Sequence, residues 1–125
     1  MLARYSMVRG TPAAELPSGT RQDTRMHTGH VLRPERDLVE RFLEDAGDLA
    51  HWRRFSSAYG ALLAARFAVD RPAFDALAAL ARAGDLLLGC NCPTAKNPDV
   101  RRCHTVLALA FMAKHYPDLD VRMPA

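Results

Sequence analysis

The chain has 125 residues, of which 49% are hydrophobic and 25% charged, and its net charge is +3 at pH 7. This length suits one domain and is too short for two ordinary ones, so we expect a single domain over 1–125. No stretch approaches the roughly 20 apolar residues that a membrane span needs, and the first ten residues do not resemble a signal peptide. The three cysteines are an odd number and lie close together, so we expect free or metal-bound thiols in a cytoplasmic protein.

The chain opens with a predicted strand over 2–8, which ends at Gly10 and Pro12. A long polar loop follows at about 9–33, because its glycines, prolines and polar residues keep no helical or strand period. Loops of this length are uncommon inside a compact fold. We expect either a solvated surface excursion or a cover over a substrate site.

Three helices are predicted next. The first opens at Pro34 and stops at Gly47, since proline suits a first helical position and glycine ends helices. Asp48 caps the second helix, whose apolar residues recur at steps of three and four. Asp70 caps the third helix, and Gly84 closes it.

The segment 85–90 reads DLLLGC and predicts a strand buried on both faces, which we place at the centre of a parallel sheet. A last helix is expected from Pro98 to about His115, with Asn97 as its N-cap. Residues 120–123 predict a final short strand.

Strands separated by helical segments favour parallel pairing. We therefore predict an α/β fold with a small, mainly parallel sheet flanked by helices, in a Rossmann-like three-layer arrangement. Open parallel sheets bind ligands beyond the carboxyl ends of their strands, so the end of 85–90 is the expected site.

Cysteine and histidine gather at that end. Cys90 and Cys92 point to one side of an extended chain, and Cys103 and His104 lie in the first turns of the next helix. Three interpretations stay open. The four residues could hold zinc, although the usual paired spacing is missing. Cys103 could be a reactive thiolate, with His104 as acid or base and Cys90 nearby. The cysteines could also be ordinary buried residues.

Basic and polar side chains around this segment suggest an anionic ligand, because a helix start with nearby cations attracts phosphate or carboxylate. The alternative is a solvated surface. The candidate ligand-binding residues are Arg21, Arg25, His27 and His30 in the long loop, and Thr94, Lys96, Arg101 and Arg102 before the last helix.

Three pieces of the chain resemble a bacterial and phage family called domain of unknown function four-eight-eight. They are ARYSMVRGTP, FSSAYGAL, and LLLGCNCP followed by CHTVLAL. In that family a hydrophobic strand ends in cysteine and a Cys-His pair begins the next helix. Thr105 stands where arginine is common in the family. The resemblance implies a compact α/β fold with a small parallel sheet and no established reaction.

The function expected from these patterns is an enzyme acting on an anionic or nucleotide-like ligand at a Cys/His site. One alternative is a module that binds nucleic acid or nucleotides without catalysis. Another is an interaction domain stabilised by zinc.

Overall fold

The fold is built on a parallel sheet at its centre, and the computed structural model describes all 125 residues. Its strands are β1 (Leu2–Ser6), β2 (Thr20–Asp23) and β3 (Leu86–Cys90), in the order β1-β3-β2. Both outer strands pair in parallel with β3. Every residue of β3 is buried, so the prediction of a central strand covered on both faces is confirmed.

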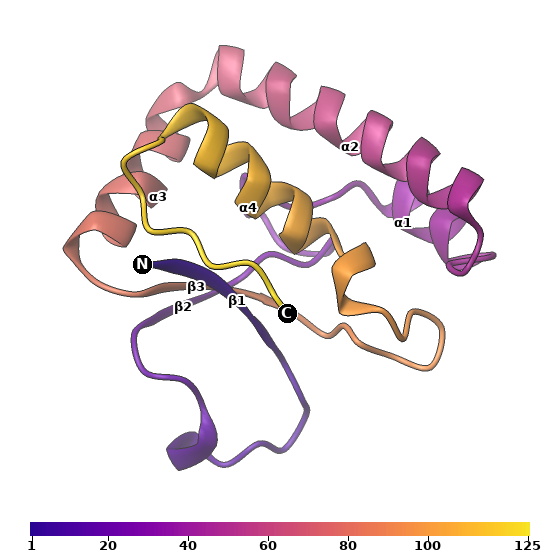
Figure 1. The fold of residues 1–125 in the computed structure, drawn as a ribbon, viewed down its shortest axis with the longest axis horizontal. Coiled ribbons are helices and arrows are strands. Elements are labelled where there is room, and N and C mark those ends of the chain that lie inside the picture. The colour runs from indigo at the N-terminus through magenta and orange to yellow at the C-terminus, as the bar shows by residue number, and fades with distance from the viewer.

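Four helices surround the sheet: α1 (Arg36–Leu43), α2 (Leu49–Val69), α3 (Arg71–Ala83) and α4 (His104–His115). Helices α3 and α4 contact the sheet, and α2 packs on both of them, with α1 against its start (Figure 1). This arrangement confirms the predicted α/β class and is consistent with a small three-layer fold. None of the helices combines the length and the apolar character that crossing a membrane requires.

The helix boundaries follow local signals in the sequence. The Asp48 side chain accepts a hydrogen bond from the backbone N–H of His51, so it caps α2 as predicted. Asp70 precedes α3 but makes no side-chain capping bond, and Pro72 lies in the first turn. The backbone N–H of Gly84 closes α3 on the Leu80 carbonyl.

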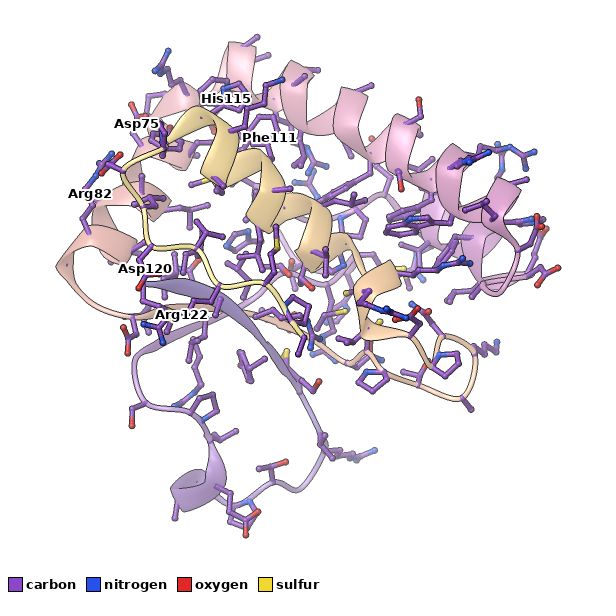
Figure 2. The ribbon with its side chains drawn as sticks, viewed as in Figure 1. Asp75, Arg82, Phe111, His115, Asp120 and Arg122 are labelled. Atoms are coloured by element: carbon purple, nitrogen blue, oxygen red, sulfur yellow. The ribbon has the colours of Figure 1, made fainter.

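Aromatic rings join the three larger helices at the end of α4 farthest from its start. Phe111 and His115 lie on the side of α4 that is turned toward the other helices (Figure 2). Phe67 of α2 lies with its ring centroid 5.5 Å from that of Phe111, and Phe74 of α3 lies at the same distance. Because these rings are packed edge-to-face or tilted, they hold this end of α4 firmly in the core.

The C-terminal segment is fastened beside β1 and α3. Arg82 of α3, labelled in Figure 2, pairs with Asp118 at 2.7 Å. Leu2 and Val121 form one parallel bridge, which replaces the short strand predicted over 120–123.

The predicted loop at about 9–33 is wrong in one respect, because it contains β2 and a short 3-10 turn, Ala13–Glu15. The strand reads TRQD and has no apolar alternation, so its pairing with β3 is carried by the backbone. Gly19 admits this pairing, since its φ of +117° and its close approach to the Asp85 carbonyl suit only glycine.

The prediction for the last helix also needs correction. Helix α4 begins at His104 and not at Pro98, with Cys103 as its N-cap residue. A 3-10 turn, Val100–Arg102, precedes it, and Asp99 accepts the capping bond of that turn. Asn97 therefore caps no helix; it is 2% exposed and binds inside the loop.

Candidate metal centre

The three cysteines meet where β3 ends and α4 begins. The chain leaves β3 at Cys90, runs outward through a loop and returns to the start of α4 on the same side of the molecule as α1 (Figure 1). This is the carboxyl edge of a parallel sheet, where such folds present their ligand sites. Cys90 and Cys92 approach from the strand end, and Cys103 approaches from the helix start.

The sulfur atoms of Cys90, Cys92 and Cys103 all lie within 4.8 Å of one another. The Cys90 and Cys92 Sγ atoms are 3.9 Å apart. Cys90 and Cys103 are buried, Cys92 is half-buried, and none of them forms a disulfide. We call this group the sulfur triangle.

Side chains of β1 fix the loop that carries Cys92. The Cys92 carbonyl accepts a hydrogen bond from the Arg4 guanidinium at 2.8 Å and another from the Ser6 hydroxyl at 2.6 Å. From the other side, the Asn97 amide donates to the Arg102 carbonyl at 2.9 Å. The loop is therefore held at both ends, which keeps Cys92 beside the other two thiols.

Hydroxyl and amide groups of neighbouring side chains donate hydrogen bonds to two of the sulfur atoms. The Thr105 hydroxyl donates to Cys103 Sγ at 3.1 Å, and the Asn97 amide donates to Cys92 Sγ at 3.6 Å. Arg4 Nε donates in turn to the Thr105 hydroxyl at 2.9 Å. Donors of this kind stabilise thiolates and are typical of the shell around cysteine ligands.

The pKa values of the three thiols are shifted in different directions. Hydrogen bonds from Cys90 and Cys92 lower the pKa of Cys103 far below its ordinary value. The same contact with Cys103 raises the pKa of Cys90 strongly, and it raises the pKa of Cys92 to about 11. Of the three thiols, Cys103 is therefore the one whose ionisation the site favours, and the positive end of α4 acts in the same direction.

His104 lies next to the sulfur triangle but is not part of it. Its Nδ1 atom is 3.8 Å from Cys103 Sγ, and its Nε2 atom is 2.8 Å from the Thr24 hydroxyl. That hydroxyl also lies 3.0 Å from the Gly89 carbonyl and donates to it. His104 is 6% exposed, and its ring is held by Thr24, the residue that follows β2, while it also lines the pocket described below.

The spacing of the sulfur triangle fits one zinc ion. Zinc binds thiolate sulfur at about 2.3 Å, which in a tetrahedral site places two sulfur atoms about 3.8 Å apart. The Cys90–Cys92 separation of 3.9 Å matches that edge. Binding of a divalent cation would also remove the difference in ionisation between the three thiols, because all three must be ionised to bind the metal.

An open pocket of about 440 Å³ lies over the sulfur triangle, which forms part of its wall. Five of the predicted ligand-binding residues line this pocket: Arg25, His27, Thr94, Lys96 and Arg102. The structure therefore brings residues of the long loop and of the segment before α4 to one place.

The other three predicted ligand-binding residues do not line the pocket. Arg21 is exposed and donates to the Pro17 carbonyl, and Arg101 pairs with Asp99 at 3.0 Å. His30 accepts from the Leu32 N–H through Nδ1 and contacts the Gln22 amide oxygen through Nε2 at 2.6 Å. These contacts give all three residues local structural roles.

Sequence reasoning assigned no contact with the cysteines or His104 to six residues that support the site. Each bonds to a cysteine, to His104 or to another member of the site: Arg4, Ser6, Thr24, Asn91, Asn97 and Thr105. Arg4 had one available signal, a charged side chain inside an apolar strand. The sequence signal at Asn97 pointed to a different role, because asparagine before proline is typical of a helix cap.

Neither a family model nor a curated protein or solved structure matches this chain. The resemblance to the family four-eight-eight therefore stays a prediction.

Proposed function

We propose that this protein is a zinc-binding domain in which Cys90, Cys92 and Cys103 hold one ion at the floor of a ligand pocket. The observation that carries the proposal is the mutual approach of three sulfur atoms within 4.8 Å. Three thiols from two separate chain segments, at these distances, supply the ligand type and the close mutual approach that a zinc site needs.

The fourth coordination position is the functional part of the proposal. Zinc sites that keep three protein ligands and leave one position open bind water or a substrate there. The pocket wall includes all three cysteines, so an ion in the sulfur triangle adjoins the pocket. The protein would thus present a metal to a small ligand, as an enzyme or as a binding protein.

The experiment is metal analysis of purified protein by mass spectrometry, followed by replacement of the metal with Co²⁺. We expect one zinc per chain and, with Co²⁺, the absorption bands of a tetrahedral site rich in sulfur. Each of Cys90→Ser, Cys92→Ser and Cys103→Ser should lose zinc. Ala95→Ser is the matched control, because it adds a hydroxyl to the same exposed loop and should keep the metal.

A chain that retains no metal after dialysis against zinc, while remaining folded, would overturn the proposal. Circular dichroism separates that result from simple unfolding. Loss of zinc in Ala95→Ser to the same extent as in the cysteine variants would also contradict the assigned ligands.

A second candidate function is supported by the position of Cys103 at the start of α4, where its sulfur accepts a hydrogen bond from the Thr105 hydroxyl and its pKa is lowered. A thiolate at a helix start can act as a nucleophile, with His104 beside it and Cys90 as a neighbouring thiol. Cys103 is 2% exposed, which limits its access to reagents. Alkylation of metal-free protein by iodoacetamide, mapped by peptide mass spectrometry, decides this candidate: selective modification of Cys103 supports it, and three slow thiols exclude it.

A further inference from the structure

The charge of the pocket over the sulfur triangle is one-sided. Its 18 lining residues include Arg25, Lys96 and Arg102 but neither aspartate nor glutamate. Arg25 is already neutralised by two hydrogen bonds to the Asp23 carboxylate, at 3.0 and 2.8 Å. Lys96 and Arg102 take part in none of the ion pairs of the chain. Two uncompensated cations therefore face this space.

The net negative charge of a zinc ion with three thiolate ligands is too small to balance both of these positive charges. A divalent ion bound by three thiolates carries one net negative charge, and Lys96 with Arg102 outweighs it by one. Arg102 is anchored by one nitrogen, which donates to the Ala46 carbonyl at 3.1 Å. Its remaining guanidinium N–H groups can bind an oxyanion, and arginine presents them in a planar fork suited to carboxylate or phosphate. The pocket thus has the charge to hold one anionic group.

The pocket also has an apolar wall, made by α1, the start of α2 and the segments before them. Phe42 and Phe55 contribute aromatic rings with centroids 5.3 Å apart. The apolar side chains of this wall are Met26, Pro34, Val39, Phe42, Leu43 and Phe55. Such a surface favours a flat apolar group over a bare inorganic ion.

We propose that the pocket binds a small organic anion, in which a carboxylate or phosphate lies between Lys96 and Arg102 and a flat apolar body lies on the aromatic wall. This inference rests on the proposed function, since the zinc ion sets the charge balance and lies at the pocket floor. It adds the chemical class of the ligand. Neutral ligands of the same shape lose the interaction with both cations.

The test uses zinc-loaded protein and four probes, with binding measured by calorimetry and zinc content measured on the same samples. Benzoate and phenyl phosphate carry both features of the ligand. Benzamide keeps the ring without the charge, and inorganic phosphate keeps the charge without the ring. We expect the two aromatic anions to bind at least tenfold more tightly than benzamide or inorganic phosphate. The tighter of the two identifies the preferred head group.

Charge-removing variants locate the binding. Lys96→Gln and Arg102→Gln should each weaken binding of the aromatic anions about tenfold, and Arg102→Lys should restore part of it. Lys114→Gln is the matched control, because Lys114 is exposed near the far end of α4 and should leave binding unchanged.

The outcomes are separable. Equal binding of benzoate and benzamide, or equal loss in Lys96→Gln and Lys114→Gln, overturns the inference. A full complement of zinc with none of the probes bound overturns the inference while the proposed function stands. Protein that cannot be loaded with zinc overturns the proposed function and the inference together.

Discussion

The Thr105 hydroxyl donates a hydrogen bond to the sulfur of Cys103 at 3.1 Å, and it accepts a hydrogen bond from Arg4 Nε at 2.9 Å. This pair of bonds connects β1 with the first turn of α4. It also directs a polarised hydroxyl at Cys103, the thiol whose pKa is lowered, so the bond strengthens as negative charge develops on the sulfur. Thr105 therefore tunes Cys103 without occupying the pocket.

Replacing Thr105 with valine removes this hydroxyl and keeps the shape of the side chain. We expect Thr105→Val to lower the zinc affinity about 10- to 100-fold, the range seen when an outer partner of a metal ligand is lost. Competition with a chromogenic zinc chelator measures the change. Thr20→Val is the control, since Thr20 is exposed on β2 and makes no side-chain hydrogen bond to the site. Equal affinities in the two variants would contradict the role of Thr105.

Asn97 gives a prediction about stability in the metal-free protein. Its buried amide donates to the Arg102 carbonyl and to Cys92 Sγ, so Asn97→Ala removes both bonds and frees the loop. We expect the free energy of unfolding to fall by about 1 to 2 kcal/mol. Urea unfolding measures it. Lys96→Ala, at an exposed position in the same loop and without an ion pair, should change stability far less. A stable Asn97→Ala variant would show that the loop holds without this amide.

The sequence predicted the part of the site that depends on the strand. Three consecutive leucines after a helix stop are typical of a strand that is buried on both faces. The position of β3 and its end at Cys90 could therefore be predicted. The N-cap role of Asp48 could also be predicted, because a short side chain that accepts hydrogen bonds is favoured just before a helix with periodic apolar residues. Local chemistry and tertiary structure agree at these positions.

The rest of the site depends on partners distant in the chain. The residues of β2 are polar, and their strand conformation comes from backbone hydrogen bonds to β3. Backbone bonds require no alternation of polar and apolar side chains, so the sequence of β2 carries no strand pattern. Asn97 has a cap signature, but the loop turns back before a helix can start, and the amide binds a sulfur and a carbonyl instead. Neither outcome is encoded within a few residues, so single-sequence patterns miss both.

His30 predicts how stability depends on pH. Burial lowers the pKa of His30, the neighbouring His104 lowers it further, and Asp23 acts in the opposite direction. Its Nδ1 atom accepts the Leu32 N–H, so the folded state needs the neutral ring. The unfolded chain binds a proton at an ordinary histidine pKa near 6.5, and the folded chain binds it only at lower pH. Stability therefore falls as the pH drops below about 6.5 and levels off below the folded-state pKa.

Chemical unfolding at several pH values between 7 and 5 checks this dependence. We expect His30→Gln to be less stable at pH 7 and to show a shallower loss of stability toward pH 5. His27→Gln removes an exposed histidine nearby and should retain the slope of the unmodified protein. A slope unaffected by His30→Gln would assign the pH dependence to other groups.

Gly19 provides a test of the strand that sequence patterns missed. Its φ is +117°, and a Cβ atom added there would lie 2.7 Å from the Asp85 carbonyl oxygen. That carbonyl accepts the backbone N–H of Thr20 at 2.8 Å, which is the first bond between β2 and the segment leading into β3. Gly19→Ala must therefore strain the backbone or displace this bond. We expect a loss of about 1 to 3 kcal/mol in the free energy of unfolding.

The matched control is Gly29→Ala, because Gly29 lies in the same segment, has open space around it and does not have a positive φ. This variant should be neutral or slightly stabilising, since alanine restricts the unfolded chain. Hydrogen exchange adds a local readout: Gly19→Ala should lose protection at the amides of β2 that pair with β3, and Gly29→Ala should keep it. If both variants kept full stability and protection, β2 would not be fixed by the Gly19–Asp85 contact, and the pairing of β2 with β3 would have to depend on its own ladder of hydrogen bonds.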